Sequence, residues 1–163
     1  MTNVQELRRS IENTVRQFIS AYQEAGEQND PSLINRDVDP DCTREFLPEA
    51  LLDFFGAPPG WASDNDAYEK ATANDLRVGR VKRATLSNLT IDTEALKAAG
   101  TSVAEMDLKD GETIIMEHAW VFDLNEDGSK ITKVVEFCDQ DAVRKFMAKV
   151  YPNGFGLEQY TIR

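Results

Sequence analysis

The sequence predicts an α+β fold in which helices cover one face of a strongly bent antiparallel sheet. In the N-terminal part of the chain, apolar residues recur at three- and four-residue intervals, a spacing typical of helices. From residue 81 onward, β-branched and alternating residues dominate, which is typical of strands. Helices followed by a run of antiparallel strands favour the α+β class, and the concave side of a bent sheet is expected to leave a pocket.

The first helix covers residues 4–22 and is predicted to end at Gly26. Its apolar side chains form one stripe, and Thr2 or Asn3 is placed to cap its N-terminus. A short second helix is predicted over residues 30–35, because it has a capping aspartate followed by proline at the first helical position.

Three further elements follow before the strands. Asp39-Pro40-Asp41 is expected to end the second helix, and residues 42–47 then form a short strand. Residues 49–55 form one or two helical turns, which a loop rich in proline and glycine ends. A third helix is predicted over residues 63–79, where several Ser, Asp and Asn side chains can serve as its N-cap.

Four strands and a last helix complete the chain. Asp110-Gly111 and residues 125–128 are hairpin turn sequences, so the last three strands should form an antiparallel meander. Asp139 or Asp141 can cap the final helix, and the tail over residues 152–163 is left unassigned. The predicted strands cover residues 83–92, 101–108, 113–124 and 130–138.

Composition restricts the class of function. The 163 residues include 18 Lys and Arg against 29 Asp and Glu, and the net charge of −11 repels nucleic acid and anionic membranes. No apolar run approaches the roughly 18 residues of a membrane span, and no secretory signal is visible. Two cysteines are too few for a disulfide framework. We therefore expect one domain over residues 1–163 that acts in the cytoplasm, without nucleic-acid or membrane partners.

The sequence contains no recognisable cofactor motif. No glycine-rich loop joins a strand to a helix, as dinucleotide or nucleoside-triphosphate binding would require. One histidine and two cysteines do not match the usual zinc spacings, and no Ser or Cys nucleophile elbow is present. These residues favour acid–base catalysis that uses neither a metal nor a cofactor.

Three segments resemble fungal SnoaL-like proteins of natural-product biosynthesis, which have the nuclear-transport-factor-two-like (NTF2-like) fold. They are residues 41–48, the helix that carries Tyr68, and residues 127–139. The resemblance implies a cone-shaped curved sheet with three to four helices around a central cavity, and a homodimer. The chain departs from the family pattern where Lys97-Ala98-Ala99-Gly100 is predicted to lengthen a connection.

The resemblance also implies an activity. The family contains cofactor-free cyclases, ring isomerases and semipinacolases that act on indole alkaloids, and a dehydratase of melanin synthesis shares the fold. We therefore expect a cofactor-independent isomerase or cyclase of polyketide, meroterpenoid or indole-alkaloid biosynthesis, acting on a small polycyclic substrate by a ring rearrangement or semipinacol-type shift. A dehydratase of the same fold, and a non-catalytic ligand-binding or dimeric interaction module, are the alternatives.

Glu136 and Arg44 are the first two candidate catalytic residues. Glu136 shares one strand face with Val134 and Cys138, so its carboxylate should be paired or have a raised pKa suited to proton transfer. The resembling family uses a glutamate at this strand position in catalysis, although an inward Glu neutralised by an arginine is the alternative. Arg44 matches a family position that reaches into the cavity, where it would hold a carbonyl or enolate or orient Glu136. The alternative for Arg44 is a surface arginine paired with an acid.

His118, the chain's one histidine, is the third catalytic candidate. Its strand face also carries Met116, Trp120 and Phe122, while Glu117 points to the opposite face. A pKa near 6.5 suits proton transfer, and a histidine packed in the core is the alternative. The aromatic residues predicted to contact the substrate are Tyr22, Trp61, Tyr68 and Trp120. Core packing is the alternative for Tyr22, Tyr68 and Trp120.

Overall fold

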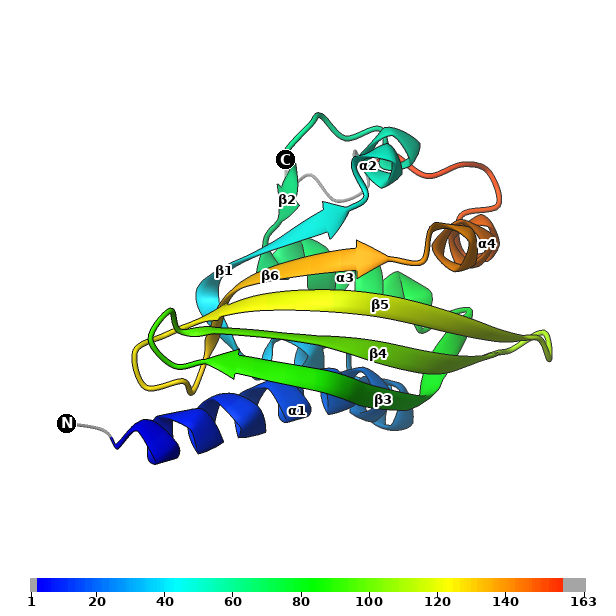
Figure 1. The fold of residues 1–163 in the computed structure, drawn as a ribbon. Helices are drawn as coiled ribbons and strands as arrows, with labels where there is room; N and C mark the ends of the chain where they lie inside the picture. The colour runs from blue at the N-terminus through cyan, green and yellow to red at the C-terminus, as the bar shows by residue number, and fades with distance from the viewer. Residues whose placement is uncertain (1–2, 157–163) are drawn as a thin grey trace.

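The computed structural model describes residues 3–156 and confirms the predicted α+β class (Figure 1). A mixed sheet is accompanied by four α-helices and one short 3-10 helix. The elements in chain order are α1 (Val4–Gln28), η1 (Pro31–Asn35), β1 (Val38–Leu47), α2 (Glu49–Phe55), β2 (Ala62–Ser63), α3 (Asn65–Asp75), β3 (Gly79–Asp92), β4 (Lys97–Leu108), β5 (Thr113–Leu124), β6 (Ile131–Cys138) and α4 (Gln140–Val150).

The strands form one six-stranded sheet in the order β2-β1-β6-β5-β4-β3. Strands β3 to β6 form an antiparallel meander, which confirms the predicted meander and adds β3 to it. Strand β1 differs from the expectation because it pairs with β6 in parallel, with Arg44 opposite Val134 and Phe46 opposite Glu136. No hairpin joins β1 to β6, so local turn chemistry does not set its direction. The two-residue strand β2 was not predicted.

The helices pack against this sheet and together with it surround one cavity. Figure 1 shows α1 running along β3, α3 behind the sheet, and α2 and α4 near the ends of β1 and β6. Residues of α1, α3, α4 and the strands β3 to β6 line one cavity. The bent sheet therefore does leave the expected pocket.

Helix α1 begins as predicted and ends later. The side chain of Asn3 accepts a backbone N–H of the first turn, and Asn29 ends the helix in the left-handed conformation, with φ 51°. The predicted end at Gly26 is wrong, because this glycine lies inside the helix. A Cβ at Gly26 would lie 2.8 Å from the Cβ of Arg80, so its small size allows β3 to approach α1.

Three strands begin earlier than predicted, and one of them is β3, which starts at Gly79 and not at residue 83. Strand β1 starts at Val38, so Asp39-Pro40-Asp41 lies within the strand, and the preceding helix η1 has already ended at Asn35. The pairing with β6 shifts register between Val38 and Thr43, which allows a proline without loss of a regular ladder bond. Strand β4 starts at Lys97, so residues 97–100 extend a strand and do not lengthen a connection.

The two faces of the sheet differ sharply in burial. Along β5 the even-numbered residues are buried and most odd-numbered ones are exposed, as the two-residue period predicted. On the inner face, Phe18 of α1 packs edge-on against Trp120 and Phe122, with ring centroids 5.7 and 5.3 Å away. On the outer face, four apolar side chains remain 42–52% exposed. This outer apolar patch consists of Val103, Ile115, Val121 and Phe137.

The structure bears on two expectations from the sequence, which concern membrane spans and the two cysteines. Among residues 3–156, no helix is long and apolar enough to cross a membrane. Cys42 and Cys138 are free and buried. Burial raises the pKa of the Cys42 thiol to about 11 and also raises that of Cys138. Both thiols are therefore protonated at neutral pH and are weak nucleophiles.

Candidate active site

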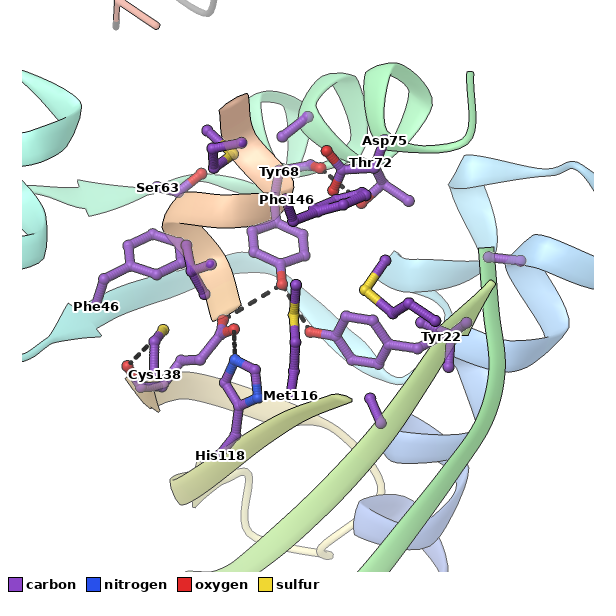
Figure 2. Close-up of a pocket in the computed structure, with 18 of the residues that line it drawn as sticks. Tyr22, Phe46, Ser63, Tyr68, Thr72, Asp75, Met116, His118, Cys138 and Phe146 are labelled. Atoms are coloured by element: carbon purple, nitrogen blue, oxygen red, sulfur yellow. Dashed lines mark hydrogen bonds and ion pairs between the residues drawn. The ribbon is translucent and has the colours of Figure 1, made fainter. Parts of the chain in front are cut away.

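A cavity of about 210 Å³ lies between the inner face of the sheet and the helices. Figure 2 shows its polar side chains converging from both sides, with Tyr68, Thr72 and Asp75 from α3 and His118 from β5. Most of the other lining residues are apolar or aromatic. An apolar cavity with a few convergent polar groups is the usual form of a small-molecule site.

Glu136 is the best-connected charged group of this cavity. It lies on β6, is 8% exposed, and places Oε1 3.2 Å from Nε2 of His118. Its Oε2 accepts a hydrogen bond of 3.3 Å from the hydroxyl of Tyr68. The predicted pairing of this carboxylate is thus present, and its partner within residues 3–156 is the histidine, not an arginine. The carboxylate is held at the cavity wall by two groups that can exchange protons with it.

His118 is fixed by its neighbours on the sheet. It pairs across the β5–β6 ladder with Cys138, while Trp120 pairs with Glu136, so His118 and Glu136 are diagonal neighbours on one face. The imidazole stacks on Trp120 with ring centroids 5.4 Å apart. The indole is itself held, because its Nε1 donates to Ser102 Oγ at 2.8 Å. His118 therefore belongs to both the aromatic core and the cavity wall.

Two tyrosines continue this network. The hydroxyls of Tyr22 on α1 and Tyr68 on α3 lie 2.8 Å apart. Burial, and then the negative charge of Glu136, raise the pKa of both phenols above the ordinary value of 10. Both phenols are therefore neutral donors at physiological pH. Tyr22, Tyr68, Glu136 and His118 form one chain of contacts along the cavity (Figure 2).

Arg44 lies behind this chain and is fully buried, so the alternative of a surface arginine does not describe it. Its Nη2 donates to the Ile34 carbonyl and to Asn35 Oδ1, both at 3.0 Å. Its guanidinium lies 4.0 Å from the ring centroid of Tyr68. Within the described chain, Nε and Nη1 have no hydrogen-bond partner. Arg44 is not part of the cavity wall, and its charge acts on the site by favouring negative charge at the two tyrosines.

The aromatic residues predicted to contact a substrate all line the cavity. Trp61 and Tyr68 each stack on Phe46, with centroids 6.0 and 6.2 Å away. Trp120 contributes to the cavity wall and also to the core. The contacts of Tyr22, Trp61, Tyr68 and Trp120 with a substrate remain predictions.

Asp75 also lines the cavity, although no motif in the sequence singles it out. Burial, and then the charge of Glu136, raise the pKa of this carboxyl from 3.8 to about 8. A usable signal was its helical spacing, since Asp75 lies seven residues after Tyr68 and three after Thr72. This spacing places the three side chains on one face of α3. The site therefore contains a second carboxyl group besides Glu136, and this second group, Asp75, favours its neutral form.

One set of side chains among residues 3–156 has the donor types of a metal site. Potential ligand atoms of His118, Glu136 and Cys138 all lie within 4.8 Å of one another. Nitrogen, oxygen and sulfur donors of this kind suit Zn²⁺. A thiol must lose its proton to bind well, and burial opposes this step by raising the pKa of Cys138. A chelator experiment therefore belongs in any test of the site.

Comparison with known proteins identifies the fold. No protein-family model and no curated protein matches the sequence. Solved structures do match, including PrhC from Penicillium brasilianum NBRC 6234, with 12% identity, a TM-score of 0.71 and coverage of 90% of this chain and 91% of that chain. The BvnE pinacolase from Penicillium brevicompactum matches with 18% identity, a TM-score of 0.71 and coverage of 91% and 95%.

An NTF2-like protein of unknown function from Burkholderia pseudomallei K96243 is also similar, with 11% identity, a TM-score of 0.55 and coverage of 84% and 96%. The fold is therefore the NTF2-like fold, as the resemblance in the sequence implied. These identities are low, so the likeness concerns the fold alone.

Proposed function

We propose that this protein is a cofactor-independent isomerase or cyclase that rearranges a ring-bearing secondary metabolite by acid–base catalysis. One observation carries the proposal. The Glu136 carboxylate lies at the wall of an apolar cavity and is held by His118 on one oxygen and by Tyr68 on the other. A carboxylate held in this way, with donors on both sides, is equipped to take a proton from a bound ligand and to return it at another atom.

The proposed reaction needs only groups that are present in the chain. Glu136 removes a proton from a substrate O–H or C–H group, while its contact with His118 Nε2 stabilises the carboxylate before transfer. With a ligand bound, the Tyr68 hydroxyl turns from Glu136 Oε2 and donates to the substrate oxygen on which negative charge develops, while the Tyr22 hydroxyl donates to the oxygen of Tyr68. Return of the proton to a different atom gives a product of unchanged mass. General acid–base catalysis of this kind contributes roughly 100- to 10,000-fold in rate.

The cavity limits the part of a substrate that it encloses. An apolar cavity of about 150 Å³ accommodates a benzene ring. At about 210 Å³, this cavity holds a somewhat larger unit, such as a fused bicyclic core, with further rings or chains at its mouth. Its aromatic and aliphatic lining favours a neutral ring system. Polyketides, meroterpenoids and indole alkaloids all contain such cores.

The likeness to BvnE supports the reaction type, because that protein is named a pinacolase. In a hydroxyketone, a pinacol-type shift moves a carbon group to the adjacent carbonyl carbon, so that the hydroxyl becomes a carbonyl, the former carbonyl oxygen takes up a proton, and the mass is unchanged. The hydroxyl proton must leave as the carbonyl forms, so the step requires a base and no redox cofactor. Dehydration by the same residues, with loss of water, is the alternative within enzymes. A non-catalytic binding or dimeric interaction module is the alternative outside them.

The test is a turnover screen with variants that differ at one carboxylate. Bicyclic and tricyclic hydroxyketones, including indole derivatives, are incubated with the protein and followed by chromatography with mass detection. We expect a product of unchanged mass whose formation is lost in Glu136→Gln. The matched control is Glu117→Gln, which changes an exposed glutamate on the outer face of β5, next to His118. That control should behave like the parent.

Each other outcome identifies a different function. A product lighter by one water assigns the protein to the dehydratases. Ligand binding without any product favours the binding module. Activity that is lost with a chelator and restored by Zn²⁺ assigns the cluster of His118, Glu136 and Cys138 to a metal and contradicts cofactor-free catalysis.

A further inference from the structure

Asp75 lies on the α3 side of the cavity. It is the last residue of α3, and its side chain faces the cavity together with those of Thr72 and Tyr68 (Figure 2). His118, by contrast, reaches the cavity from β5 on the opposite side. A ligand in the cavity therefore has one carboxyl group on the helix side and another, Glu136, on the sheet side.

The Asp75 carboxyl lacks the partners that usually accompany a buried acid. Within residues 3–156 the structure gives it no hydrogen bond and no ion pair, whereas its neighbour Asn74 donates to the hydroxyl of Tyr151. Asp75 also lies at the C-terminal end of a helix, where the helix dipole disfavours negative charge. Both features oppose the ionised form and leave a neutral O–H group that can turn toward a ligand.

The groups around the cavity do not offset this effect. Glu136 is the other carboxyl group in the wall, and its charge acts in the same direction as burial in raising the pKa of Asp75. The titratable and charged groups that line the cavity are Tyr22 from α1, Tyr68 from α3, Arg80 from β3, His118 from β5, Glu136 and Cys138 from β6, and Tyr151 after α4. Arg80 is exposed and makes no ion pair with Asp75 in the described chain.

We propose that Asp75 is the second catalytic acid of this cavity, a neutral carboxylic acid that donates its proton to a substrate oxygen while Glu136 accepts a proton from the other end of the same substrate. The inference rests on the proposed function and deepens it. It assigns the two carboxyl groups opposite roles, because one is held by two donors and the other has no partner.

The proton transfers balance without any further reactant. Glu136 takes a proton from a substrate carbon or hydroxyl, the electron pair moves through the substrate to a carbonyl oxygen, and the Asp75 O–H protonates that oxygen. Asp75 is then a carboxylate and Glu136 a carboxylic acid. After removal of a C–H proton, Glu136 delivers its proton to another carbon and the new O–H returns its proton to Asp75. After removal of an O–H proton, the new hydroxyl keeps the proton from Asp75, and Glu136 then loses a proton to solvent while Asp75 regains one from solvent. Both residues regain their starting states, and the product is an isomer.

This arrangement also defines a substrate class. The substrate must carry a hydrogen-bond acceptor oxygen at the end that meets α3 and an acidic O–H or C–H group at the end that meets β6. A bicyclic hydroxyketone with its two oxygens on opposite sides of the ring system fits both conditions. A substrate with its own carboxylate at the α3 end would be repelled once Asp75 ionises.

Two measurements test the proposal. In the first, protein labelled with ¹³C-aspartate is titrated by NMR, and the Asp75 side-chain signal is identified by its absence in Asp75→Asn. We expect a midpoint near 8, far above that of exposed aspartates. In the second, turnover of the best substrate is measured for Asp75→Asn, with the exposed Asp66→Asn of the same helix as control. We expect Asp75→Asn to lose roughly 10- to 100-fold in kcat, and its rate to lack the fall that the parent shows above pH 8.

The outcomes separate this inference from the function on which it rests. If Glu136→Gln is inactive but Asp75→Asn turns over like the parent, the inference is overturned and the proposed function stands. An Asp75 midpoint below 5 would also overturn it, because the group would be ionised in the working enzyme. If ligands bind and no variant, the parent included, forms product, both proposals fail.

Discussion

Replacing Asp75 with asparagine should stabilise the protein, and the gain should grow with pH. In the unfolded chain this carboxyl ionises at its ordinary value of 3.8, whereas the folded protein holds its pKa at about 8. Between these two values, the unfolded state has released a proton that the folded state retains. Rising pH therefore favours unfolding by about 1.4 kcal/mol for each pH unit. Below pH 4 and above pH 8 the contribution is constant.

The magnitude follows from the same pKa. The full interval would cost about 6 kcal/mol, which is a ceiling because solvent screens a partly accessible carboxylate. Asp75 is also only half-buried by its accessible surface. We expect about 2–3 kcal/mol at pH 9, which corresponds to a rise in Tm of about 5–10 °C for a chain of this length. At pH 4 the variant and the parent should melt together.

The assay is thermal unfolding followed by circular dichroism between pH 4 and pH 9. Asp66→Asn is the control, because its carboxylate is exposed in the first turn of the same helix, where the dipole favours negative charge. That variant should gain nothing at any pH. A stability gain of Asp75→Asn that is equal at pH 4 and pH 9, or absent at both, would refute the reasoning.

Three further predictions concern other parts of the molecule. Arg44→Ala leaves a cavity behind Tyr68, so it should lower the free energy of unfolding, measured in urea, by about 2–4 kcal/mol and should also reduce turnover. A variant as stable as the parent would contradict the buried position of Arg44. Tyr68→Phe should fold normally and lose about tenfold or more in kcat, since it keeps the ring and removes the hydroxyl next to Glu136; unchanged kcat would exclude this hydroxyl from the reaction. We also propose a homodimer through the outer apolar patch. Light scattering should then give twice the chain mass of 18.3 kDa for the parent and the mass of a single chain for Phe137→Lys. A monomeric parent would contradict the dimer.

The sequence predicts most reliably what repeats at short range. In β5 and β6 the two-residue period correctly places His118 and Glu136 on the inner face and Glu117 and Phe137 on the outer face. The caps at Asn3, Asp30, Asp64 and Asp139 are equally local, since each side chain accepts a backbone N–H two or three residues further along. Such features depend on a few neighbouring residues and need no knowledge of the rest of the chain.

What the sequence could not predict depends on contacts between distant residues. The parallel pairing of β1 with β6 and the position of Gly26 against Arg80 arise from packing across the fold. Arg44 looks like an ordinary strand arginine, and only the structure places it behind the ring of Tyr68. Asp75 belongs to no motif in the sequence, and an aspartate on a helix that also carries other charged residues is usually exposed to solvent. Its pKa is raised by burial in a cavity that several distant elements build together.

The central claim is that Glu136 transfers a proton in this cavity, and a comparison of affinity with rate in Glu136→Gln tests it most directly. Glutamine keeps the shape of the side chain but cannot accept the proton. Ligand affinity is measured by calorimetry, and the chemical step is measured in a single turnover with the same ligand. We predict that affinity changes by less than about tenfold while the rate falls by roughly 100-fold or more. A variant that binds and turns over the ligand as the parent does would contradict the claim.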